Sequence, residues 1–172
     1  PIDNEIIGFI GSGYIGPVPV PVIEMLLLVV LFSFFLKNTV LGRQIYAVGS
    51  NAEAARLSGV NTRRVLMFVY TINGALCAFA GIVQAGLLST AATNAGVGAE
   101  LSVVAAVVIG GTSLFGGEGS ITGSIIGAAI MAIVRNAFVL LRLPSAAQTI
   151  TIGIVIVAAV AVDNMRKHPG KA

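Results

Sequence analysis

Residue types that usually carry out catalysis are few in this chain and lie far apart along it. There is one histidine, His168, and one cysteine, Cys77. A nucleophilic serine needs a base within hydrogen-bond reach, and Ser33 has no such residue near it in its apolar segment. A single cysteine also excludes a disulfide framework and a cysteine-based metal site. We therefore expect no enzymatic activity, no metal ion and no cofactor.

Nucleotide-binding motifs are equally weak. Residues 11–16 match the pattern G-x-G-x-x-G, but the next residues are PVPVPV, which cannot open a helix in the register that a pyrophosphate site needs. We interpret this segment as a glycine-rich loop at a membrane surface. The P-loop pattern G-x-x-x-x-G-K-[ST] does not occur in the sequence, so ATP hydrolysis by that route is not expected. Nor do we expect a nucleic-acid partner.

One polar constellation does predict a defined element, a short helix from Ala52 to Ser58. Asn51 is a good N-cap, and Glu53 in the first turn and Arg56 near the last turn have the signs that the helix dipole favours. Gly59 supplies the C-terminal stop. A short capped helix of this kind suits docking into a groove on a cytoplasmic partner. The segment comprises Asn51, Glu53, Ala54, Ala55, Arg56, Leu57, Ser58 and Gly59.

The rest of the chain indicates an integral membrane protein. Of its 172 residues, 56% are hydrophobic and 10% are charged, against about 25% charged in soluble domains, and the mean hydropathy is +0.98. A membrane-crossing helix needs roughly 20 apolar residues. Such spans are expected at about 20–36, 65–87, 101–117, 120–141 and 148–163. The third span is short or broken, because glycines follow an apolar run of only half the required length. Asn61 is expected to cap the start of the second span.

The distribution of basic residues predicts the orientation. The stretch from Lys37 to Arg64 contains five basic residues and one acidic residue, and the tail after the fifth span is also basic. The positive-inside rule places both in the cytoplasm, so an even number of crossings must separate them and the short third span must cross as well. We therefore predict an all-α polytopic membrane helix bundle of about five crossings that forms one transmembrane domain over residues 1–172. Its N-terminus is extracytoplasmic and its C-terminus cytoplasmic.

Small residues recur at helical spacing in the fourth span. Gly119, Gly123 and Gly127 lie four residues apart, and such a face allows close packing of helix backbones. Charged residues avoid the span centres, apart from Arg135, which we expect to extend towards the outer surface. The scattered uncharged polar groups suit a hydroxylated, uncharged solute better than an ion.

Two long strings carry a resemblance to a known family. LGRQIYAVGSNAEAARLSGVNTRRV, and then GVGAELSVVAAVVIGGTSLFGGEGSITGSIIGAAI, resemble the permease subunits of bacterial sugar ABC importers of the ribose, xylose and galactose type. The resemblance covers nearly the whole chain, which looks like the C-terminal half of a roughly ten-helix permease.

The resemblance implies an inner-membrane subunit that moves a small polar solute, a monosaccharide, inward. It implies ABC ATPase subunits, a second permease copy and a periplasmic solute-binding protein as partners, with the 51–59 segment as the ATPase-coupling helix. It also implies that the 101–120 stretch is a broken helix near the translocation pathway of the solute. Candidate pathway residues are Asn73, Asn94, Glu100, Ser102, Gly110, Gly111, Thr112 and Ser113. Alternative functions are a branched-chain amino acid or nucleoside permease of the same superfamily, or a self-contained membrane channel.

Overall fold

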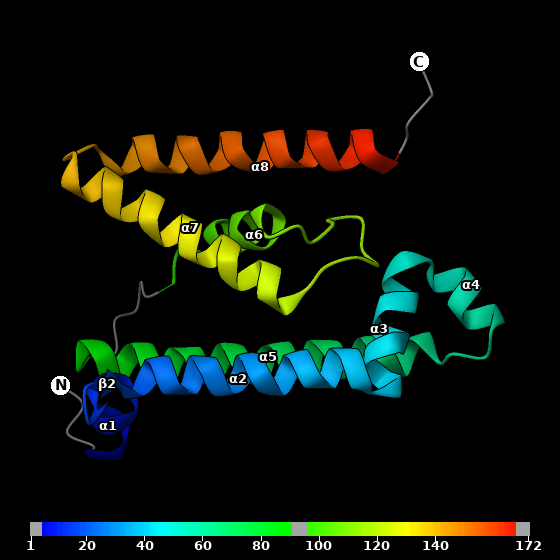
Figure 1. Ribbon diagram of the computed structural model, residues 1–172, viewed down its shortest axis with the longest axis horizontal. Coiled ribbons are helices and arrows are strands. Elements are labelled where there is room, and N and C mark those ends of the chain that lie inside the picture. The colour runs from blue at the N-terminus through cyan, green and yellow to red at the C-terminus, as the bar shows by residue number, and fades with distance from the viewer. Residues whose placement is uncertain (1–4, 91–95, 168–172) are drawn as a thin grey trace. The chain divides into compact units, whose positions relative to one another are not determined.

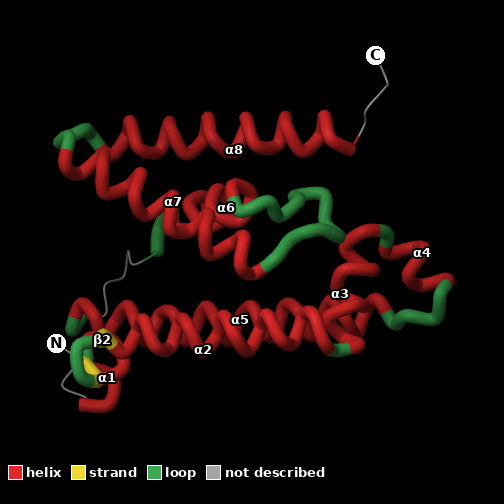
Figure 2. The backbone as a smooth tube through the Cα atoms, in the orientation of Figure 1, coloured by secondary structure: helices red, strands yellow, loops and turns green. Residues whose placement is uncertain are grey.

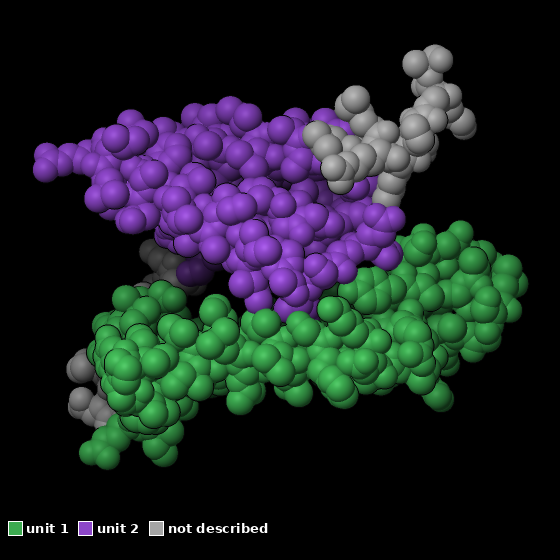
Figure 3. Space-filling view, in the orientation of Figure 1, with its two compact units in different colours: residues 1–95 green, residues 96–172 purple. Residues whose placement is uncertain are grey.

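The computed structural model describes residues 5–90 and 96–167 of the chain, which form eight helices and one short hairpin (Figure 1). The chain divides into two compact units, Pro1–Ala95 and Gly96–Ala172, which Figure 3 shows in different colours. Each unit is described by itself below.

The first unit begins with helix α1 (Glu5–Ser12), which packs against α2 (Val20–Asn38) and α5 (Thr62–Leu88). Between α1 and α2, strands β1 (Tyr14–Ile15) and β2 (Val18–Pro19) form an antiparallel hairpin. The glycine-rich motif therefore leads into a hairpin, and no helix opens at its third glycine. Helix α2 starts beside two prolines because a proline in the first turn has no intrahelical hydrogen bond to lose.

Two further helices connect α2 to α5, namely α3 (Val40–Ser50) and α4 (Ala52–Leu57). Sequence analysis anticipated α4 and did not anticipate α3. Thr39 separates α2 from α3: its N–H donates to the Phe35 carbonyl, and its side chain accepts a hydrogen bond from Gly42 N at 3.0 Å. The signal for α3 was therefore present as a threonine N-cap, but the polar character of the 37–64 stretch favoured a loop.

The second unit consists of α6 (Ala99–Ile109), α7 (Ile121–Leu140) and α8 (Ser145–Lys167), with non-helical residues 110–120 between α6 and α7 (Figure 2). Helix α6 packs against both α7 and α8. Its backbone touches that of α7, because a Cβ atom at Gly123 or Gly127 would overlap a backbone carbonyl oxygen of Gly110 or Ala106. The small-residue face predicted for the fourth span is thus the α6–α7 contact. Gly74 and Gly81 of α5 have no such neighbour within 4 Å.

Buried apolar residues form two small clusters, one in each unit. Val48, Ala55 and Val65 make up the first, and Ala105, Ala106, Met131 and Ile152 make up the second. Few large apolar side chains on the long helices are buried: only 6% of the most apolar stretches of α2 and α5 is buried. A water-exposed surface of this kind would aggregate.

Three helices, α2, α5 and α7, are long and apolar enough to cross a membrane, and α6 and residues 146–161 of α8 are shorter apolar helices. These helices confirm the predicted fold class, an all-α membrane helix bundle. Helix α6 ends at Ile109, so the third expected span is helical only in its first part. The number of crossings, five, stays a prediction.

Candidate functional site

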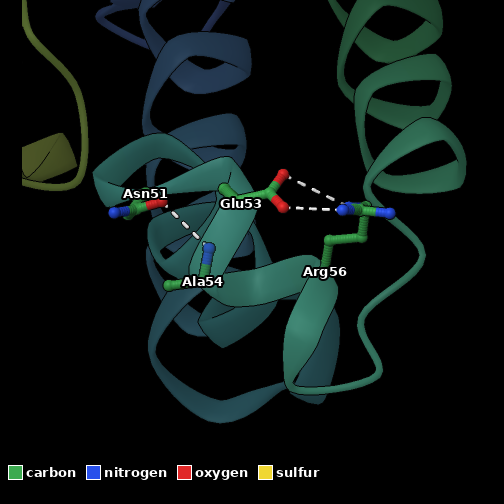
Figure 4. A network of polar contacts seen from close by, with 4 residues as sticks. All are labelled: Asn51, Glu53, Ala54 and Arg56. Atoms are coloured by element: carbon green, nitrogen blue, oxygen red, sulfur yellow. Dashed lines mark hydrogen bonds and ion pairs between the residues drawn. The ribbon is translucent and has the colours of Figure 1, made fainter.

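The capped helix α4 has the local structure that the sequence predicts (Figure 4). The Asn51 side chain accepts a hydrogen bond from Ala54 N at 2.9 Å, which satisfies one of the free amides of the first turn. Arg56 donates to Glu53 through two contacts, Nη2 to Oε1 at 2.6 Å and Nε to Oε2 at 3.2 Å. Both side chains are about two-thirds exposed, so solvent screens this pair and its contribution to stability is small.

The C-terminal end of α4 is closed by side-chain and backbone contacts. Ser58 is the C-cap, and its hydroxyl donates to the Ala54 carbonyl at 2.9 Å. Gly59 follows with a φ of +84°, a value that costs other residues about 1–2 kcal/mol. The Asn61 side chain accepts from Arg64 N at 3.1 Å and caps the start of α5, as predicted. The short segment between α4 and α5 is therefore fixed by the C-cap of one helix and the N-cap of the next.

Helix α4 has one buried side and one exposed side. Ala55 is only 5% exposed and packs against Val48 of α3 and Val65 of α5. Ala54 lies on the exposed part of the helix, and the Leu57 side chain is 77% exposed. The exposed side of α4 therefore carries one large apolar residue, Leu57, beside the small Ala54. Helices α3 and α5 thus hold α4 in place while its outer surface is left free.

The candidate pathway residues of α6 lie at two places in the second unit. Glu100 is exposed in the first turn, and Ser102 lines an open cavity of about 310 Å³. Arg135 and Gln148 are the other polar side chains that line this cavity, which is otherwise apolar. Its lining consists of Ala99, Ser102, Val103, Ala106, Ala128, Met131, Ala132, Val134, Arg135, Gln148 and Ile152. Sequence analysis noticed Arg135 but did not connect it with Ser102.

The second place is the loop at the other end of α6. Gly110 is the C-cap of α6, Thr112 Oγ1 lies 3.4 Å from Ser124 Oγ, and Ser113 Oγ donates to Asp163 Oδ2 at 2.8 Å. Gly111, between them, has a φ of +84°. Eight residues of helix separate Ser102 from Gly110, or about 12 Å, so the structure does not join the two groups into one site.

Two candidates cannot be placed beside these residues. Asn73 is exposed on α5 of the first unit, and Asn94 lies outside the described residues. Asp163, which contacts Ser113, is a functional candidate that sequence reasoning missed. The two residues are 50 positions apart, and no local pattern connects them.

Comparison with known proteins identifies the family. Residues 2–160 match the family described as "Branched-chain amino acid transport system / permease component". The ribose import permease protein of Haemophilus influenzae is 43% identical over 163 residues, which is 94% of this chain and 50% of that protein. The corresponding Escherichia coli protein is 43% identical over 163 residues, 95% of this chain and 51% of its own length.

The xylose transport system permease protein of Escherichia coli is 43% identical over 151 residues, 88% of this chain and 38% of that protein. This chain therefore spans about half the length, or less, of these curated relatives. No solved structure matches it. The match over residues 2–160, together with the apolar helices, shows that the chain belongs to this family of transport-system permease components and is a multi-pass membrane protein.

Proposed function

We propose that this chain is the membrane-spanning permease part of an ABC importer that moves a monosaccharide into the cell. A separate ATPase drives the transport, a periplasmic solute-binding protein delivers the sugar, and a second permease copy completes the pathway. The names of the relatives support the sugar: two are ribose permeases and one is a xylose permease. The same names favour a sugar over an amino acid or a nucleoside.

Helix α4 is the observation that carries this proposal. It is short, capped at both ends and fixed through buried Ala55, and it presents Ala54 and Leu57 on its exposed side. A rigid exposed helix between two membrane helices can transmit the movement of a docked ATPase to the helices on either side of it. We assign ATPase coupling to residues 51–59 on this basis.

The proposed orientation follows from charge. Arg56, Arg63 and Arg64 lie at or next to α4, and the positive-inside rule places them on the cytoplasmic side, where an ATPase is present. The chain then has an extracytoplasmic N-terminus and a cytoplasmic C-terminus, in the bacterial inner membrane. The Ser102 cavity, at the opposite end of α6 from the Gly110 loop, lies on the extracytoplasmic side in this orientation.

Co-purification in detergent tests the proposal. The protein is captured with its cognate ATPase subunit as wild type and as Ala54→Asp, which adds a charge to the exposed side of α4 and leaves the buried side unchanged. We expect Ala54→Asp to lose the ATPase while eluting from size exclusion at the wild-type position. Thr90→Asp is the matched control, because it adds the same charge at an exposed residue beyond the other end of α5, and it should retain the ATPase.

The result separates the proposal from its main alternative. A folded wild-type protein that captures no ATPase would favour a self-contained channel. Equal capture by wild type and Ala54→Asp would show that the interface lies elsewhere than on α4.

A further inference from the structure

Ser113 links residues of the 110–120 loop to one another and to α8. Among the residues that the structure describes, Ser113 is the buried polar one, with 8% of its surface exposed. Its N–H donates to the Glu118 carbonyl, and its hydroxyl oxygen accepts from Phe115 N at 3.2 Å. The same hydroxyl donates to Asp163 Oδ2 of α8 at 2.8 Å. Ser113 therefore takes part both in the hydrogen bonds within the loop and in the hydrogen bond that joins the loop to α8.

Asp163 lies where the apolar part of α8 ends. It is in the last two turns of the helix, after an almost entirely apolar stretch from Ile150 to Val160, and Arg166 and Lys167 follow three and four residues later. The Ser113 hydroxyl adds a tertiary contact to this carboxyl group, and a hydrogen bond to an ionised acceptor is about twice as strong as one between neutral groups.

The loop has no regular secondary structure. It contains no helix or strand between Ile109 and Ile121, and Gly111, Gly116 and Gly117 have positive φ values. A second side-chain contact with a helix, between Thr112 Oγ1 and Ser124 Oγ, is 3.4 Å long, which is long for a hydrogen bond between hydroxyl groups. The Ser113–Asp163 hydrogen bond, at 2.8 Å, is the shorter of these two links.

We propose that Asp163 is a positioning residue for translocation: through Ser113 it holds the 110–120 loop against α8, in the conformation that solute passage requires. This inference rests on the proposed function, and on the expectation from the family resemblance that the 101–120 stretch is a broken helix near the pathway. It assigns a role to an acidic residue of α8 that no pattern in the sequence singles out.

Hydrogen exchange of the assembled transporter in detergent tests the contact itself. The variants are Asp163→Ala, Ser113→Ala, the double variant and Asp163→Asn, which keeps an acceptor oxygen. We expect the loop amides to exchange roughly tenfold to hundredfold faster in Asp163→Ala and Ser113→Ala, the range that corresponds to a hydrogen bond to a charged group. The double variant should be no faster than Ser113→Ala, because that variant already removes the link to Asp163 along with the contact to Phe115 N. Asp163→Asn should stay within a few-fold of wild type.

A control variant separates a local effect from general loosening of α8. Thr151→Ala removes a half-buried hydroxyl of α8 whose hydrogen bond, within the described part of the chain, goes to the Ala147 carbonyl of its own helix, so the loop should exchange at the wild-type rate. Peptides from α6 and α7 should be unchanged in every variant. Unchanged loop exchange in Asp163→Ala, or an equal increase throughout the unit, would overturn the proposal.

Transport measurements in proteoliposomes then test the use of the contact. We expect Asp163→Ala and Ser113→Ala to move about tenfold less solute per ATP hydrolysed than wild type. Asp163→Asn should keep most of the wild-type amount of solute moved per ATP hydrolysed. A variant that is only less stable would lose transport and ATP hydrolysis together. Faster loop exchange with an unchanged ratio would overturn the positioning role. A wild-type protein that transports no sugar would refute the proposed function, while the exchange comparison would still decide whether Asp163 holds the loop.

Discussion

The contact between α6 and α7 predicts opposite effects for the same substitution at two glycines. A Cβ atom at Gly127 would lie 2.8 Å from Gly110 N and 2.9 Å from Ala106 C, whereas ordinary van der Waals contact begins at 3.4 Å. It would also overlap the Ala106 carbonyl oxygen. All three atoms belong to the backbone, so no side-chain rotation can relieve the overlap and the two helices must separate. A Cβ atom at Gly153 of α8, by contrast, would have no heavy atom within 4 Å.

We expect Gly127→Ala to destabilise the protein and Gly153→Ala to stabilise it. Overlap with backbone atoms belongs to the upper part of the range for overpacking, about 2–3 kcal/mol, against a gain of about 1 kcal/mol in helix propensity, so the net loss at Gly127 is about 1–2 kcal/mol. One kcal/mol shifts the midpoint temperature of thermal unfolding by about 2–4 °C for a chain of this size, so the midpoint of Gly127→Ala should lie roughly 2–8 °C below that of wild type. Gly153→Ala keeps only the propensity gain, and its midpoint should rise by roughly 2–4 °C.

The assay is the fraction of protein that remains monodisperse on size exclusion after heating in detergent, with both variants and wild type measured in parallel. A Gly127→Ala protein as stable as wild type would refute the close approach of the α6 and α7 backbones. A large loss for Gly153→Ala would show that another surface covers that face of α8, and the difference between the two glycines would then have no basis.

Helix α4 and its surroundings give four further predictions. Asn51→Ala removes the N-cap and should cost about 1 kcal/mol, measured as roughly fivefold faster hydrogen exchange of α4. Gly59→Ala should shift exchange in the same direction, because alanine is strained at a φ of +84° by about 1–2 kcal/mol. Ala55→Asp places a carboxylate among buried apolar side chains and should lower the yield of monodisperse protein, since an unpaired buried charge is costly; normal yield would contradict the buried position. In a Cys77→Ala background expressed without the ATPase, Leu57→Cys should react with a membrane-impermeant maleimide in inverted vesicles and stay unmodified in right-side-out ones.

Local interactions explain why helix α4 could be predicted from sequence. Asn51, Glu53, Arg56 and Gly59 act on the backbone within four residues of themselves, so their spacing alone defines where α4 begins and ends. Apolar length predicted the long helices for a similar reason, because the bilayer imposes a minimum on any helix that crosses it. The regular spacing of glycines likewise indicated a close helix contact.

Helix α3 was missed although its cap is local. Its composition is mixed, and the 37–64 stretch was interpreted through its charge, which predicts sidedness and says little about secondary structure. The Thr39 side chain and the contact of Gly42 with the Leu36 backbone distinguish a helix that turns sharply from α2 from an extended loop.

The tertiary structure alone decided which residues meet. Ala54 and Ala55 are consecutive alanines that the sequence does not distinguish. The packing of Val48 and Val65 determines that Ala55 is buried and Ala54 exposed. The partner of the α7 glycines is α6, and the partner of Ser113 is Asp163, 50 residues later. Hydrogen bonds and backbone contacts between distant segments depend on how the helices cross, and a single sequence contains no periodic signal for that geometry.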